Sequence, residues 1–181
     1  MAPGPPPVGP ILFMYFVLGS ALSFLTGRKP GTLPEDIIAE MALPCVVLSL
    51  WVMSYSVMDV MGVGKAKIKY NLQSKTYKDY PANEPEEVYF ANRAQMNQVE
   101  QMASYMVSTL MFSFLVNGRI GGLLSFIYLV LRQLYTSTYR ACAGKSLEDA
   151  GLVKYTIPCY FILNGMAAAV VVQMGRYALQ I

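Results

Sequence analysis

The stretch Arg93-Ala94-Gln95-Met96-Asn97-Gln98-Val99-Glu100-Gln101 leads directly into an apolar run from Met102 to Val116. At a rise of about 1.5 Å per residue, this run is too short to cross a hydrocarbon core of about 30 Å. A helix that spans a membrane here must carry part of the polar stretch below the membrane surface. Charges in that position are costly, so they normally face a bundle interior and find a partner.

The polar residues of this stretch are arranged as a stripe. Arg93, Asn97 and Glu100 are spaced at i, i+4 and i+7, on one face of an α-helix, and Tyr89 continues that face. A later apolar segment carries a second stripe at the same spacing: Tyr128, Arg132, Tyr135 and Tyr139. We expect both stripes to face a shared interior, where they either tie helices together or bind a ligand. Two arginines against one carboxylate favour an anionic ligand.

The composition indicates a membrane protein. Of the 181 residues, 55% are hydrophobic and 14% are charged, whereas a soluble domain has about a quarter charged residues. Five apolar segments are evident, at about 10–26, 36–62, 86–116, 120–139 and 152–179. We therefore predict an all-α fold: an integral membrane four-helix bundle over residues 36–181. A proline-rich tail and an additional N-terminal apolar helix, together residues 1–35, precede it.

Basic residues in the connections predict the orientation of the bundle. The connection from Lys65 to Pro85 is rich in lysine, and the connection after the fourth segment carries Arg140, Lys145 and Lys154. Two helices separate these connections, so we expect both at the same end. Cytoplasmic loops of membrane proteins carry an excess of Lys and Arg, so this end is predicted to be cytoplasmic or its organellar equivalent.

Several classes of site are not expected. The chain has no histidine, and Cys45, Cys142 and Cys159 lie far apart in the sequence. Metal and haem sites usually rely on these residue types at close spacing, so we predict no metal site. The net charge of +3 is small, and the basic residues are dispersed, which does not suggest nucleic acid as a partner.

The octapeptide from Arg93 to Glu100 resembles the R-A-Q-x-N-x-x-E signature of the MAPEG family, the membrane-associated proteins in eicosanoid and glutathione metabolism. Two further motifs resemble the family in the same order. They are the basic segment from Gly64 to Asn71, and Arg132 followed by Tyr135 and Tyr139. The resemblance covers about residues 36–181.

The resemblance implies four transmembrane helices per chain in an endomembrane or organellar membrane, surrounded by lipids and assembled as a homotrimer. It further implies that glutathione binds between neighbouring chains. The residues that match glutathione-binding positions are Arg93, Gln95, Asn97, Glu100, Tyr135 and Tyr139. A thiol is activated when cationic groups stabilise its thiolate. The candidates for this catalytic role are Arg93, Arg132 and Lys145.

The chain also departs from the family pattern. Active members carry an arginine shortly after the tyrosine pair, but Arg140 comes too early here, and Ser146 or Leu147 stands at the matching place. Two functions therefore stay open. One is a glutathione transferase or peroxidase acting on lipophilic substrates. The other is a non-catalytic structural subunit that uses the same fold as a scaffold in a larger membrane complex.

Overall fold

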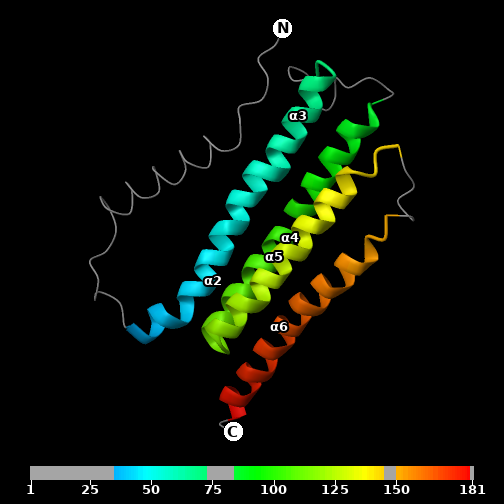
Figure 1. Ribbon diagram of the computed structural model, residues 1–181. Helices are drawn as coiled ribbons and strands as arrows, with labels where there is room; N and C mark the ends of the chain where they lie inside the picture. The colour runs from blue at the N-terminus through cyan, green and yellow to red at the C-terminus, as the bar shows by residue number, and fades with distance from the viewer. Residues whose placement is uncertain (1–34, 73–83, 145–149, 180–181) are drawn as a thin grey trace, which may run out of the picture.

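The computed structural model describes residues 35–72, 84–144 and 150–179, which form four helical rods (Figure 1). The first rod is continuous and consists of α2 (Glu35–Ser54), the π-helix η1 (Tyr55–Val60) and α3 (Met61–Lys69). The others are α4 (Glu86–Leu115), α5 (Gly118–Arg140) and α6 (Val153–Leu179). The predicted N-terminal helix at 10–26 lies outside the described residues, as does the tail before it.

The bounds of α4, α5 and α6 agree closely with the apolar segments of the sequence, but the first rod is longer than predicted. We expected a connection from Lys65, whereas the helix continues to Lys69. Lysine is a good helix former, and cations are stabilised near a helix C-terminus. In addition, Lys69 Nζ lies 2.6 Å from Glu87 Oε1 of α4. The loop prediction was therefore wrong for residues 65–69.

At one end of the bundle lie the end of α3, the start of α4, the end of α5 and the start of α6 (Figure 1). Besides the Lys69–Glu87 ion pair, the Gly144 N–H after α5 donates to Glu86 Oε2 at 2.6 Å. This arrangement confirms the prediction that the lysine-rich connection and the connection after α5 lie at the same end.

The opposite end holds α2 against the turn between α4 and α5. Asn117 caps α5, since its Oδ1 accepts from the Ile120 N–H at 2.9 Å. The Gly118 N–H donates to Glu40 Oε2 at 2.9 Å. A Cβ at position 118 would collide with the Glu40 backbone carbonyl, so a glycine is needed for α2 and α5 to approach this closely.

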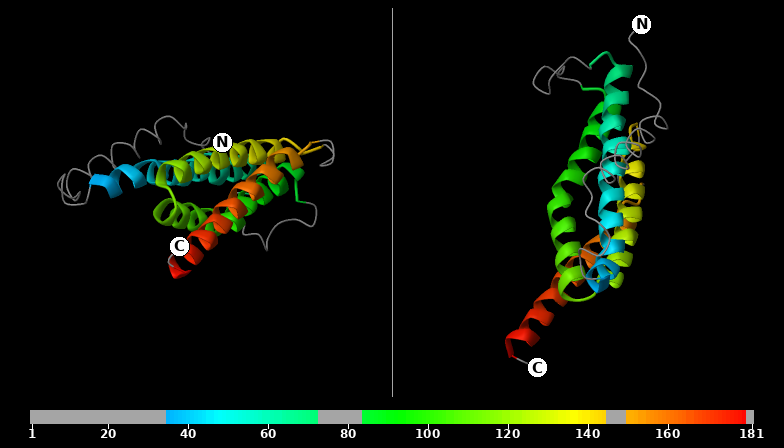
Figure 2. Two further views of the ribbon diagram at one scale, coloured as in Figure 1. Left: turned by 90° about the horizontal axis from the view of Figure 1, so that it is seen from below. Right: turned by 90° about the vertical axis from the view of Figure 1, so that its left-hand side faces the viewer.

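The hydrophobic core draws on all four rods. It contains Val47 and Trp51 of α2, Tyr105 of α4, Tyr128 of α5 and Met166 of α6. The Tyr105 and Tyr128 rings stack with centroids 4.4 Å apart. Beyond this core the C-terminal half of α6 diverges from the other helices (Figure 2).

Two described helices are long and apolar enough to cross a membrane. They are the first rod, Glu35–Lys69, and Val153–Arg176 of α6. Helices α4 and α5 are not among them, since they carry the two polar stripes. For α4 and α5 to cross a membrane, as predicted, their polar stripes must be covered by protein and kept away from lipid.

Candidate functional site

Arg132 lies in the interior, as predicted, with 5% of its surface exposed. Its Nε donates to Gln98 Oε1 at 3.1 Å, and its Nη2 donates to the Asn97 backbone carbonyl at 2.6 Å. The guanidinium also lies over the Tyr135 ring, 4.8 Å from its centroid. Arg132 therefore fastens α5 to α4 at the middle of the polar network.

Three of the predicted binding residues gather beside Arg132. Asn97 Nδ2 donates to the Tyr135 hydroxyl at 3.1 Å. Tyr139 is buried next to Tyr135, with ring centroids 5.8 Å apart, and packs against Phe90. The α4 and α5 stripes thus meet at Asn97, Tyr135 and Tyr139.

Arg93 and Glu100 lie at the exposed edge of the α4 stripe, whereas Asn97 is half-buried. Arg93 and Glu100 form an ion pair with each other, 3.8 Å from Nη1 to Oε1, and their side chains are 45% and 52% exposed. The expectation that both charges are buried is wrong for the single chain. Helix α4 instead turns Ala94 and Gln98 inward, which leaves the Arg93–Glu100 side facing outward.

A groove of about 430 Å³ lies on this outer face and is lined by Arg93 and Gln95, together with Glu84, Tyr89, Asn92 and Met96. Gln95 also connects the groove to the first rod, because its Nε2 donates to the Tyr55 hydroxyl at 3.1 Å. The predicted site residues are thus divided between the interior network around Arg132 and this outer groove.

Arg140 donates hydrogen bonds to two residues of the π-helix η1. Its Nη1 donates to the Met58 carbonyl at 2.6 Å and to Asp59 Oδ1 at 3.1 Å. Lys145, the other basic candidate after the tyrosine pair, lies outside the described residues. The cation nearest in sequence to Tyr139 is therefore held by Asp59.

Asp59 was not singled out from the sequence, and neither was Gln133. Asp59 is 1% exposed, and its carboxyl faces the side chains of Gln133, Thr136 and Gln98. A signal was present, because a carboxylate deep in an apolar segment normally marks a polar partner in the bundle. The π-helix that presents Asp59 belongs to a class found frequently at functional sites.

No three His, Cys, Asp or Glu side chains gather as a metal site within residues 35–72, 84–144 and 150–179. The polar network of these residues consists of guanidinium, amide, phenol and carboxylate groups. Such groups can bind an anionic or zwitterionic ligand through hydrogen bonds and ion pairs.

The MAPEG family model matches residues 41–151, more than half of the chain. The chain belongs to the MAPEG family. Searches among curated proteins and among solved structures found no match.

The part that matches the MAPEG family contains every predicted site residue, from Arg93 to Lys145. MAPEG proteins are membrane-bound, and the two long apolar helices of this chain agree with that. The protein is therefore a membrane protein.

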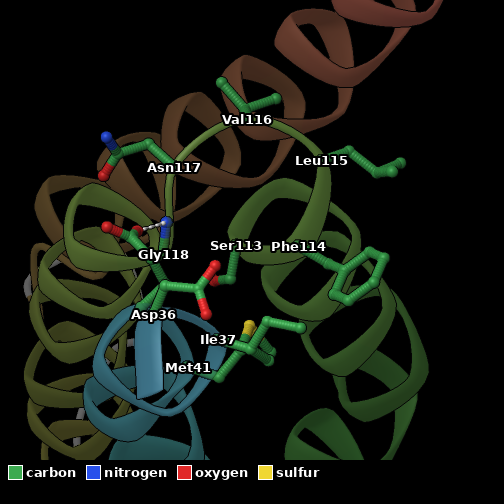
Figure 3. A pocket seen from close by; sticks show the side chains of 10 residues that line it. Asp36, Ile37, Met41, Ser113, Phe114, Leu115, Val116, Asn117 and Gly118 are labelled. Atoms are coloured by element: carbon green, nitrogen blue, oxygen red, sulfur yellow. Dashed lines mark hydrogen bonds between the residues drawn. The ribbon is translucent and has the colours of Figure 1, made fainter. Parts of the chain in front are cut away.

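This MAPEG chain has another cavity, of about 350 Å³, at the end of the bundle opposite Lys69 (Figure 3). It lies beside the Gly118–Glu40 hydrogen bond, and its lining includes Asp36, Ser113 and Asn117. None of the predicted glutathione-binding residues lines it. It is separate from the candidate site.

Proposed function

We propose that this MAPEG protein binds glutathione at the outer face of α4 and acts as a glutathione transferase or peroxidase on lipophilic substrates. The observation that carries the proposal is the half-exposed Arg93–Glu100 ion pair. Charges exposed to lipid are costly, so this face needs a polar cover. A homotrimer with glutathione between neighbouring chains would provide one.

The chemistry of the pair suits glutathione. The tripeptide carries carboxylates and an ammonium group, which are complementary to an adjacent guanidinium and carboxylate. Tyr89 and Gln95 line the same groove as Arg93 and would add hydrogen bonds. Asn97, Tyr135 and Tyr139 lie next to one another through the Asn97–Tyr135 bond and the tyrosine contact. They would complete the site, Asn97 from α4 and the two tyrosines from α5.

Arg93 is the best placed of three arginines to stabilise a glutathione thiolate. Arg132 already donates hydrogen bonds to Gln98 and Asn97. Arg140 already donates to Asp59 and Met58. Arg93 instead lines an open groove. Because the family's arginine after the tyrosine pair is replaced, we expect slow turnover even when glutathione is bound.

Calorimetry of the detergent-solubilised protein with glutathione tests binding first. Arg93→Ala should weaken binding at least tenfold, because a hydrogen bond to a charged group contributes about 1.5–3 kcal/mol. Arg119→Ala is the matched control, since Arg119 lies on α5 at the far end of the bundle. No detectable binding by the wild-type protein at millimolar glutathione would remove the enzyme proposal. A conjugation assay with a lipophilic electrophile then tests catalysis.

The second candidate is a non-catalytic subunit of a larger membrane complex. It is favoured by Arg132 and Arg140, which both donate hydrogen bonds to residues of the same chain. Polar contacts of this kind can hold membrane helices together without binding a ligand. Residues 1–35 would then serve as a docking element. Native mass spectrometry after mild extraction separates the candidates, since the enzyme proposal predicts three copies of this chain and the subunit proposal predicts defined additional chains.

A further inference from the structure

An apolar groove of about 420 Å³ lies between the first rod and α5. Leu50 and Met58 line it from the first rod, and Val130 and Leu134 line it from α5. These four side chains are all exposed in the single chain, and none of the described residues of α4 or α6 lines the groove. The groove is therefore an apolar surface on the outside of the four rods.

The exposed apolar surface continues from the groove towards the start of α2. Leu43 is one heptad before Leu50, so it lies on the same face of α2, and it is exposed. Leu123 and Ile127 are also exposed and continue the face of α5 that carries Val130. We call the groove together with Leu43, Leu123 and Ile127 the α2–α5 strip. It follows the joint of the two helices along most of the length of α2.

The apolar segment 10–26 is connected to α2 by residues 27–34 alone. Helices in a bundle that are joined by a connection this short are usually antiparallel neighbours. As a helix, residues 10–26 would be about 25 Å long at 1.5 Å per residue, and Leu50 lies about 22 Å along the helix axis from Glu35. An antiparallel helix that begins beside Glu35 therefore reaches the groove. An extended connection could shift it further along the strip by up to about 26 Å.

The composition of segment 10–26 suits packing against another helix. Gly19 and Ser23 are spaced at i and i+4, and small residues at this spacing allow membrane helices to approach closely. Ala21 is two residues from each and lies on the other side of such a helix. The covalent connection gives the segment an effective concentration on the order of millimolar. A second copy of the chain has no such advantage, so the preceding segment is the favoured occupant of the strip.

We propose that residues 10–26 form a helix that packs antiparallel to α2 on the α2–α5 strip, with Gly19 and Ser23 facing the bundle and the residues around Leu12 in the groove. The outer surface of the first rod and α5 is then covered by the chain itself. The groove on the outer face of α4 shares no lining residue with the strip. That face stays open to a partner, and the proposal does not depend on glutathione.

Cysteine cross-linking of the full chain in lipid nanodiscs tests the proposal. In a Cys45→Ala background, which removes the exposed native thiol, Val130→Cys is combined in turn with one further substitution. A bifunctional maleimide and trypsin should then join the peptide that ends at Arg28 to the peptide 120–132, in a protein that migrates as a monomer. The four further substitutions, which together cover every face of a helix, are Ile11→Cys, Leu12→Cys, Phe13→Cys and Met14→Cys.

The matched control replaces Val130→Cys with Phe161→Cys, at a position that is 75% exposed on α6. We expect at least fivefold more cross-linked product at Val130 than at Phe161 for the best of the four positions. Equal yields at the two sites would overturn the proposal. So would a product that joins two chains, which assigns the strip to a second copy, or no product at Val130, which assigns it to lipid.

Substitutions within the segment test which of its faces meets the bundle. Gly19→Leu combined with Ser23→Leu should lower the yield of the Val130 cross-link at least threefold, because the added side chains hold the helix away from the strip. Ala21→Leu adds a side chain of the same size to the other side of the helix and should leave the yield unchanged. If Ala21→Leu lowers the yield as much as the double substitution does, the packing through Gly19 and Ser23 is refuted.

Discussion

Arg140 at the end of α5 forms an ion pair with Asp59 in the π-helix of the first rod. Its Nη1 lies 3.1 Å from Asp59 Oδ1, with the Asp59 side chain fully buried and that of Arg140 20% exposed. The same nitrogen donates to the Met58 carbonyl. One cation therefore neutralises a buried carboxylate and satisfies a backbone group of η1.

Arg140→Ala should destabilise the protein by about 3–5 kcal/mol, because it leaves the buried Asp59 carboxylate without its counter-charge. Arg119→Ala removes a looser, exposed ion pair with Glu40, at 3.8 Å, and should cost no more than about 1 kcal/mol. Chemical unfolding in detergent measures both. Equal losses for the two variants would show that the Asp59–Arg140 pair contributes nothing beyond a surface pair.

Gly118→Ala should destabilise the bundle by about 1–3 kcal/mol, since the new methyl group meets the Glu40 backbone and must separate α2 from α5. Gly165→Ala in α6 is the matched control, because a Cβ there has nothing within 4 Å. It should stabilise the helix by about 0.5–1 kcal/mol. Melting temperatures that move in the same direction for both variants would argue against the close approach at Gly118.

Gln98→Leu should cost about 1–3 kcal/mol, because it removes the acceptor of the buried Arg132 Nε. Gln101→Leu tests the same substitution at a half-buried position of the same helix and should have a smaller effect. Circular dichroism during thermal unfolding compares the two. If Gln101→Leu is the more damaging variant, the inward direction assigned to Gln98 is wrong.

Cysteine cross-linking tests whether the outer face of α4 is covered by a second copy. Val107 is 60% exposed on α4, and Phe126 is 46% exposed on α5. In a Cys45→Ala background, which removes the exposed native thiol, mild oxidation should cross-link Val107→Cys into dimers. Phe126→Cys should remain monomeric on a non-reducing gel. Absence of cross-linking at Val107 would leave the Arg93–Glu100 pair without the proposed neighbour.

Helix bounds were largely predictable from the sequence. The apolar segments define α4, α5 and α6 because long apolar stretches must be buried or face lipid whatever their neighbours are. The first rod extends beyond its predicted end, to Lys69. Lysines are common in loops, but they are also favourable at a helix C-terminus. The membership of the MAPEG family was likewise evident from the Arg93–Glu100 octapeptide and the motifs after it.

The sequence by itself determined which residues share a helical face: Arg93 with Glu100, and Arg132 with Tyr135 and Tyr139. Only the tertiary structure decided which faces point inward, placing Gln98 against Arg132 and leaving Arg93 and Glu100 outside. Helical spacing gives angles within one helix, whereas the rotation of that helix is set by packing against the others. Asp59 lies in the π-helix of the first rod and pairs with Arg140, 81 residues further along the sequence, a contact that no helical spacing within one segment could indicate.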